Sequence, residues 1–388
     1  MKKSLLALAA MGAFVGAAQA QSSVTVYGLI DAGVGQSNIT SGANGVNSTK
    51  QNFVGGLNSG NGTGQEAGSR LGFRGTEDVG GGTRVGFTFE TGVTFANTEA
   101  STAAPVQTSG TLANTAMFGT TRQAFASLGN SKFGELRIGT QDSLAKNLGG
   151  FYDPTKEAIT TGATSLYQQG VVTRYGQAAT YQAPVIAGVT IRAQYANDGS
   201  TYGTVSAANT STSNNVWSLS AKFDQGPLSI GAVYEARLAY FVAAGSANGT
   251  TALLPNLTTA TTYSSINQTI VGAQYNLGAV TPMLQYYNQK WNNTNSSLSG
   301  GINGIQIGAT APVTPTVSLV ASYISGKVTN NNSDLYNTAG YQAQVNYALS
   351  KRSRLYGIWG QTNWNSQRTA TTADVKVQQY GLGVLHTF

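Results

Sequence analysis

The feature that most constrains the fold is an alternation of apolar and polar side chains, with a period of two, along most of the chain. It is clear in the segments that begin at Val24, Leu71, Val85, Val189, Trp217, Val317 and Tyr341. A period of two gives a β-strand one apolar face and one polar face. Beyond residue 20 the sequence shows no convincing amphipathic helix of a dozen residues, so it predicts an all-β protein.

The composition excludes several functional classes. Charged residues make up only 10% of the chain and hydrophobic residues 40%, which is unlike a disordered protein. The chain has no Cys and a single His, His386. A disulfide scaffold, a Cys-ligated zinc site and a thiol nucleophile are therefore excluded, and a His-based metal centre or Ser-His-Asp triad has almost no basis. We expect no enzyme, no metal and no cofactor.

The N-terminal segment has the pattern of an export signal. Lys2 and Lys3 precede an apolar run over residues 4–17, and Ala18-Gln19-Ala20 has the small-x-small pattern of a cleavage site. We predict a signal peptide over 1–20 and a mature chain over 21–388; an uncleaved anchor helix is the alternative. Without its two lysines the chain keeps 20 of its 22 Lys and Arg against 15 acids, a net charge of +5. No later apolar run approaches the length of a transmembrane helix.

The connections between alternating segments are of two kinds. Some are tight, as at 80–82, 225–227, 277–278 and 348–352. Others are long and polar, over 37–66, 98–115, 197–215, 243–263, 292–303 and 327–338. Short turns that alternate with long loops are typical of outer-membrane barrels, with the turns in the periplasm. A soluble β-sandwich or repeat array is the alternative, but the apolar faces end in Tyr, Trp or Phe, as a membrane-interface girdle requires.

The length of the chain sets the size of such a barrel. A strand of ~10 residues with its share of turn and loop takes ~23 residues, so the mature chain holds about sixteen strands. A barrel of that width encloses an aqueous lumen, which eight strands do not. We therefore predict a transmembrane antiparallel β-barrel of about 16 strands whose polar faces line water.

One long connection differs from the others. About thirty residues, approximately 142–172, separate the alternating segment 134–141 from the next one, which begins at Arg174. The connection carries mixed charges and the aromatic side chains of Phe151, Tyr152 and Tyr167. In a wide barrel it could fold into the lumen and narrow the pore; an ordinary exposed loop is the alternative.

Several segments, in order along the chain, resemble the trimeric general-diffusion porins of Gram-negative bacteria, of the β-proteobacterial type. SSVTVYGLIDAGV (22–34) is similar to the first strand of that family, and SRLGFRGTEDVGGGTRVGFTFETG (69–92) to its second hairpin. RQAFASLGNSKFGELRIGTQ (122–141) is similar to the hairpin before the constriction loop. YALSKRSRLYG (347–357) and GLGVLHTF (381–388) resemble the last two family signatures. The resemblance spreads over the whole mature chain.

The resemblance implies a sixteen-stranded barrel in the outer membrane, in contact with its lipid, that assembles as a homotrimer. It also implies that the third loop, here about 142–172, folds into the lumen of each barrel. The implied function is passive diffusion of ions and small hydrophilic solutes through a water-filled channel. A solute-specific outer-membrane channel and, from a different class, a structural or adhesin barrel remain as alternatives. The loop sequences match no family pattern, so the sequence does not define the solute.

The expected site residues are charged side chains around the pore. The basic residues on polar strand faces near the loop are Arg70, Arg74, Arg84, Arg122, Arg137, Arg174 and Arg192. The sequence does not define on which face of its strand Arg122 lies, because both faces of residues 122–128 carry apolar and polar side chains. Opposite them we expect the loop acids Asp142, Asp153 and Glu157, which would set up a transverse field across the waist. The alternation defines faces but not heights along the pore.

The net positive charge of the mature chain leads to two further expectations. Arginines on the pore wall predict a modest anion preference that is strongest at low ionic strength. The pI of about 9.4 does not indicate a nucleic-acid partner, because single arginines recur on strand faces instead of clustering. His386 alternates with Val384 and Phe388, so we expect it to face lipid or a subunit contact and not a catalytic site.

Overall fold

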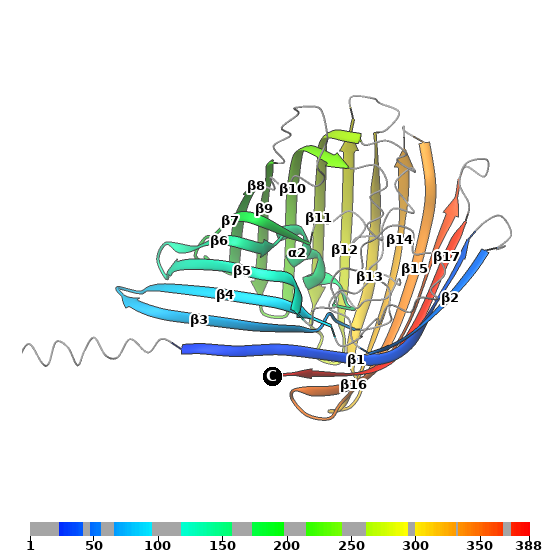
Figure 1. The fold of residues 1–388 in the computed structure, drawn as a ribbon, viewed down its shortest axis with the longest axis horizontal. Helices are drawn as coiled ribbons and strands as arrows, with labels where there is room; N and C mark the ends of the chain where they lie inside the picture. Colours follow the sequence, from blue (N-terminus) through cyan, green and yellow to red (C-terminus); the bar gives the residue numbers. More distant parts are fainter. Residues whose placement is uncertain are drawn as a thin grey trace, which may run out of the picture.

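The chain folds into one antiparallel β-sheet that closes on itself into a barrel (Figure 1). The computed structural model describes residues 23–41, 47–55, 66–94, 118–156, 173–197, 215–242, 261–293, 299–330, 333–367 and 374–388. The predicted signal peptide, 1–20, lies outside these ranges. In the described part of the chain, no helix has the length and apolar character needed to span a membrane.

The elements follow one another along the chain as a series of hairpins with a single described helix. The strands are β1 (Ser23–Ser41), β2 (Asn47–Gly55), β3 (Arg70–Gly80), β4 (Thr83–Val93), β5 (Phe118–Asn130), β6 (Gly134–Asp142), β7 (Arg174–Gln182), β8 (Val189–Asn197), β9 (Asn215–Gln225), β10 (Leu228–Val242), β11 (Thr261–Tyr275), β12 (Thr281–Asn292), β13 (Gly300–Pro312), β14 (Val317–Asn330), β15 (Ser333–Ala348), β16 (Ser353–Ser366) and β17 (Val375–Thr387). The helix α2 (Leu144–Tyr152) lies between β6 and β7.

The barrel closes at β1, which is the longest strand. Residues 29–41 of β1 pair with β17. Along the other edge of β1, residues 33–41 pair with β2 and residues 23–29 pair with β3. β2 and β3 therefore run in the same direction along one edge and form a single strand that residues 56–69 interrupt. The 17 segments occupy sixteen strand positions, which confirms the predicted barrel size.

The two faces of the strands differ as the alternation predicts. On the outer face, side chains such as Ile191, Leu219 and Leu284 are 46%, 51% and 50% exposed. On the inner face, polar side chains such as Gln285 and Gln306 are almost fully buried among their neighbours. An apolar outer band and a polar interior are what a membrane barrel with an aqueous lumen requires.

The connections at the two ends of the barrel also differ in length. One end has tight connections, as at 81–82, 226–227 and 349–352, and the other carries the long segments 94–117, 143–173, 198–214 and 243–260. We refer to these as the turn end and the loop end. In outer-membrane barrels the turns lie in the periplasm and the loops outside.

Two of the expected loops are wrong, because strands run through them. β1 and β2 occupy much of 37–66, and β14 and β15 continue through most of 327–338. At the loop end of these strands the outward residues are polar, like the inward ones. Examples are Asn38 opposite Lys50 and Lys327 opposite Asn337. The periodicity of hydrophobicity therefore disappears while the backbone ladder continues.

Candidate pore constriction

Helix α2 leaves the wall at the end of β6 and crosses the interior of the barrel. Ser143 caps it, since the Ser143 Oγ accepts a hydrogen bond of 3.0 Å from the backbone N–H of Lys146. Its apolar side chains Leu144, Leu148 and Tyr152 are buried, and the helix contacts β9, β10, β11 and β12. This confirms, for residues 143–156, the prediction that the loop folds into the lumen; residues 157–172, including Glu157, lie outside the described part.

The wall under α2 has glycines where the helix touches it. At Gly231, a Cβ atom would lie 2.8 Å from Leu148 Cδ1, and at Gly272 it would overlap the Tyr152 ring. The Tyr152 hydroxyl lies 3.0 Å from Ser229 Oγ. Burial raises the pKa of Tyr152, so its hydroxyl stays protonated at neutral pH. Either hydroxyl of the Tyr152–Ser229 pair can donate the hydrogen bond. We call the inner face of β9–β13, which α2 covers, the covered wall.

The chain remains attached to the covered wall after the helix. Asp153 is fully buried, and its Oδ1 accepts hydrogen bonds of 2.9 Å from the Thr155 backbone N–H and from Gln306 Nε2 on β13. Pro154 lies against Gly308, also on β13. The sequence predicted that Asp153 would face the arginines. It instead binds the opposite side of the lumen, because a buried carboxylate needs these donors.

The predicted arginines gather on the other side of the interior. Arg70, Arg74, Arg84, Arg137 and Arg192 alternate with outward residues such as Phe73, Val85 and Ile191, and so point inward. Arg122 also points inward, because its Nε lies 2.6 Å from Oε1 of the inward Glu90. Arg174, at the start of β7, pairs with Asp142 at the end of β6. We call this inner face of β3–β8 the basic wall.

The arginines of the basic wall lie at different heights, which the sequence did not define. Arg84 is the second residue of β4 and lies at the turn end. Arg137 and Arg192 are the fourth residues of their strands. Near the start of α2, Arg70 has Arg122, Arg174, Glu90 and Asp142 as its electrostatic neighbours. Charge therefore extends along the wall from the turn end to the level of the helix.

The arginines also differ in whether a carboxylate neutralises them. Arg122 pairs with Glu90, Arg137 Nη2 lies 2.9 Å from Glu135 Oε2, and Arg174 Nε lies 2.9 Å from Asp142 Oδ1. Asp142 also accepts from Lys146 Nζ at 2.8 Å. The sequence predicted that Asp142 would lie across the lumen from the arginines. It instead lies beside Arg174 on the basic wall.

Four arginines of the basic wall form no ion pair with a described acid: Arg70, Arg74, Arg84 and Arg192. Arg74 instead lies over the Tyr27 ring, with its Cζ atom 5.2 Å from the ring centroid. Arg192 Nε donates to Gln182 Oε1 at 2.8 Å. The basic wall therefore carries net positive charge toward the lumen.

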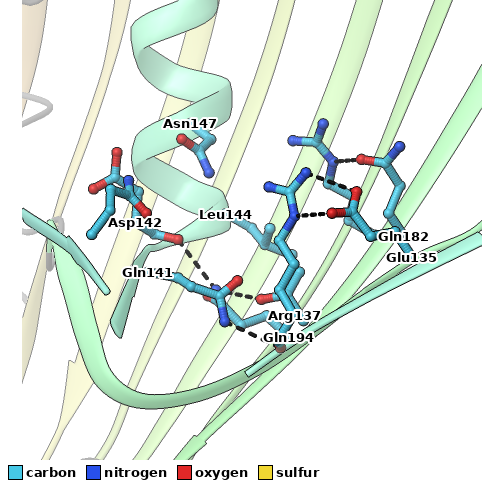
Figure 2. A pocket seen from close by; sticks show the side chains of 11 residues that line it. Glu135, Arg137, Gln141, Asp142, Leu144, Asn147, Gln182 and Gln194 are labelled. Atoms are coloured by element: carbon cyan, nitrogen blue, oxygen red, sulfur yellow. Dashed lines mark hydrogen bonds and ion pairs between the residues drawn. The ribbon is translucent and has the colours of Figure 1, made fainter. Parts of the chain in front are cut away.

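A polar cavity of about 150 Å³ lies in the basic wall beside α2 (Figure 2). Figure 2 shows the Arg137–Glu135 pair on one side of it and Asn147 of the helix on the other. Side-chain amides supply much of its remaining lining, from Gln123, Gln141, Gln182 and Gln194. The lining of the cavity is mostly polar, which suits water and small polar solutes.

The sequence analysis did not show which charged groups of the interior meet other side chains. Lys222 on β9 lies over the Phe151 ring of α2, with Nζ 4.1 Å from the ring centroid. Glu235 of β10 is fully buried and accepts a hydrogen bond of 2.6 Å from the Tyr175 hydroxyl of β7. These residues occupy polar faces of predicted strands, but only the folded barrel shows which of them meet.

A second segment lies inside the barrel, at the interruption between β2 and β3. Glu66 Oε2 accepts from Arg354 Nε at 2.9 Å, and the backbone N–H of Ala67 donates to Asp31 Oδ2 at 2.7 Å. Tyr356 donates to the other oxygen of Asp31 at 2.6 Å. These bonds join the inner faces of β1 and β16 behind the segment. Asp31, the one charged residue of the first strand, was the sequence signal for it.

Two sequence expectations concern metal ligands and His386 in the described part of the chain. No group of three or more His, Cys, Asp or Glu there could hold a metal ion. His386 Nδ1 lies 2.8 Å from Ser353 Oγ, and its ring stacks on Phe388. It shares the outward face of β17 with Leu382 and Val384, as expected.

Comparison with known proteins agrees with this architecture. Residues 7–367 match the family model of Gram-negative porins, so the chain belongs to that family. An outer membrane porin protein of Bordetella pertussis is 31% identical over 247 residues, which cover 61% of this chain and 59% of that protein. Outer membrane porin protein 32 of Delftia acidovorans is 39% identical over 139 residues, 36% of this chain and 31% of that protein. These alignments span less than two thirds of either relative.

Solved structures show the same fold. An anion-selective porin from Comamonas acidovorans superposes with a TM-score of 0.68, over 95% of this chain and 100% of that one, at 21% identity. OmpT of Vibrio cholerae gives a TM-score of 0.61 over 95% of this chain and 98% of its own, at 15% identity. Family membership and the barrel place this chain in a Gram-negative outer membrane, in a family of channels and not of enzymes.

Proposed function

We propose that the chain forms a water-filled channel for passive diffusion of ions and small hydrophilic solutes. The observation that carries this proposal is the lumen between α2 and the basic wall, where charged and amide side chains face one another. Those groups are stable there because water solvates them. No step in this function needs a catalytic group, a cofactor or an energy source.

We further propose that the channel prefers anions modestly. Arg70, Arg74, Arg84 and Arg192 keep unneutralised charge on the basic wall, and two loop acids are bound to the wall and not free. Fixed positive charge in a low-dielectric channel concentrates anions, and salt screens the effect. The anion-selective porin of Comamonas acidovorans, which has the same fold, supports this direction.

The outer face supports a homotrimer. At the loop end of β2, β1 and β17, outward polar groups bond to one another: Gln36 Nε2 donates to Asn52 Oδ1 at 2.7 Å, and the Tyr380 hydroxyl donates to Gln36 Oε1 at 2.8 Å. On β16, the outward Gln361 is only 8% exposed and donates to Tyr341. Because these outward polar groups bond to one another and Gln361 is nearly buried, we propose that this face contacts another copy of the chain.

Single-channel recording in a planar lipid bilayer tests the proposed channel. Purified protein should insert in steps of uniform conductance that rise in proportion to salt concentration, as in a water-filled pore. The absence of conductance steps from folded protein in repeated insertions would favour a structural or adhesin barrel. A conductance that a single solute class blocks at saturable concentrations would favour a solute-specific channel.

A further inference from the structure

We propose that a short file of internal water molecules is bound behind α2, on the inner face of β8–β11. Four inward polar side chains stand side by side there, and we call them the polar row: Gln194 of β8, Ser218 of β9, Glu235 of β10 and Gln268 of β11. Each side chain is no more than 3% exposed. Each also has one buried oxygen without a hydrogen-bond partner among the described residues: Gln194 Oε1, Ser218 Oγ, Glu235 Oε2 and Gln268 Oε1.

Hydrogen bonds to β7 orient two members of the polar row. Gln194 Nε2 donates to Thr180 Oγ1 on β7 at 2.9 Å, so the Oε1 of the same amide lies on the opposite side, toward Ser218. Glu235 Oε1 accepts from the Tyr175 hydroxyl at 2.6 Å, which leaves Oε2 to take another donor. Since adjacent strands lie about 4.8 Å apart, the row spans roughly 14 Å. The unpartnered oxygens thus follow one another across four strands.

Apolar side chains enclose the polar row on two sides. Toward the loop end, Tyr175 packs with Ala196 and Val216, the next inward residues of β8 and β9. Toward the turn end, Val233 and Ile270 are the next inward residues of β10 and β11, and both belong to the apolar cluster under α2. The row is therefore a polar strip between two apolar clusters.

The chemistry of the polar row favours water over other ligands. Amide and carboxylate oxygens only accept hydrogen bonds and the Ser218 hydroxyl offers one proton, so the row cannot satisfy itself. A water molecule donates two hydrogen bonds and makes about three in a protein interior, so about three molecules bridge the row. A metal cation also binds oxygen, but Arg237 Nε lies 3.6 Å from Glu235 Oε1 and already balances that carboxylate.

The proposed file meets the lumen at Gln194. This residue also lines the polar cavity beside α2, together with Thr180 and Asp142. Water can therefore exchange between the cavity and the row around a single side chain. The space behind α2 is then a side branch of the lumen that admits water, while the apolar clusters exclude larger solutes.

X-ray radiolysis footprinting tests the file in the wild-type protein, because bound water generates hydroxyl radicals that oxidise the side chains beside it. Tyr175 and Tyr152 are equally buried, at 1% and 0% exposure. Tyr175 touches the polar row through Glu235, whereas Tyr152 packs against Gly272. In folded protein in detergent, Tyr175 should be oxidised several-fold faster than Tyr152. Equal rates would overturn the proposal, and this readout does not depend on conductance.

A variant and a crystal structure test the polar row itself. Ser218→Ala/Gln268→Leu removes two of the oxygens and should lower the oxidation of Tyr175 to the rate of Tyr152. Gln344→Leu changes a buried glutamine on β15 and should leave that rate unchanged.

A high-resolution crystal structure of the wild type keeps the proposal testable if the double variant does not fold. It should show water about 2.5–3.2 Å from the four oxygens. The proposal is overturned if residues 157–172 supply donors there, or if the site holds a metal ion at about 2.3–2.6 Å from several of the oxygens.

Discussion

The basic wall and the covered wall enclose the same lumen, but the covered wall is packed against α2 and the basic wall presents charged side chains. The covered wall presents small residues such as Gly231 and Gly272 to α2 and buries Tyr152, so it is a packed interface. The basic wall keeps Arg70 and Arg192 without a carboxylate partner among the described residues. One wall positions the helix by close packing, and the other supplies the charge. The pore is the space left between them.

The largest expected effect is a difference in cysteine labelling between inner and outer positions of the barrel. Single cysteines can replace Arg84, Arg192 or Lys222 on the inner face and Ile191 or Leu219 on the outer face, in a chain that has no native Cys. Water-soluble maleimide should label the inner set in membranes and spare the outer set, because thiolate needs water to react. Equal labelling of both sets would show that the strand register is wrong.

Releasing α2 from the covered wall should have the next largest effect. Tyr152→Ala removes the buried ring and its contact with Ser229, which should weaken docking by about 3–5 kcal/mol. The helix would then leave the wall for part of the time, and single-channel recordings should show larger, fluctuating conductance.

Asn147→Ala serves as the matched control, because Asn147 is exposed on the same helix. Its conductance should remain steady. If Tyr152→Ala has the same steady conductance as the wild type, the helix does not limit the pore.

Neutralising two neighbouring arginines of the basic wall should give unequal losses of stability. Arg122→Gln leaves Glu90, whose side chain is 10% exposed, without its 2.6 Å partner and should cost about 3 kcal/mol in the free energy of unfolding. Arg70→Gln removes a charge that faces Arg122 and Arg174, and should cost much less. Urea unfolding in detergent measures both; equal losses would contradict the assignment of paired and unpaired arginines.

A smaller effect should come from the contact that joins the two walls. The Tyr175 hydroxyl of β7 donates to the buried Glu235 of β10, and Tyr175→Phe should cost about 2 kcal/mol because the acceptor is a buried carboxylate. Tyr195→Phe removes an exposed bond to Asn215 and should change stability little. If thermal unfolding shows the same midpoint for both variants, Tyr175 does not hold the walls together.

The sequence predicted the barrel well because its signal is repeated in every strand. The alternation around Ile191 and Leu219 defined faces that the register reproduces. It could not show that β1 and β2 occupy 37–41 and 47–55, because most residues there are polar and the alternation is lost. It also did not reveal α2, a nine-residue helix that contains Gly149 and Gly150 and is stabilised by its contacts with the covered wall.

The site was predictable only in part for a similar reason. Alternation put the arginines on one face, but the height of each along the pore and the pairing of Arg122 with Glu90 depend on the register between strands. Asp153 was misplaced because its partner, Gln306, is 153 residues away. Contacts over such separations have no local pattern.

The reversal potential of the wild-type channel in a KCl gradient at low ionic strength tests the central claim most directly. The basic wall should give a potential with the sign of anion preference that declines as salt increases. Replacing Arg137 or Arg174 with Glu should move it toward cation preference, and Arg192→Glu should do the same. A wild-type channel that already selects cations at low salt would show that carboxylates, and not the arginines, control the field in the pore.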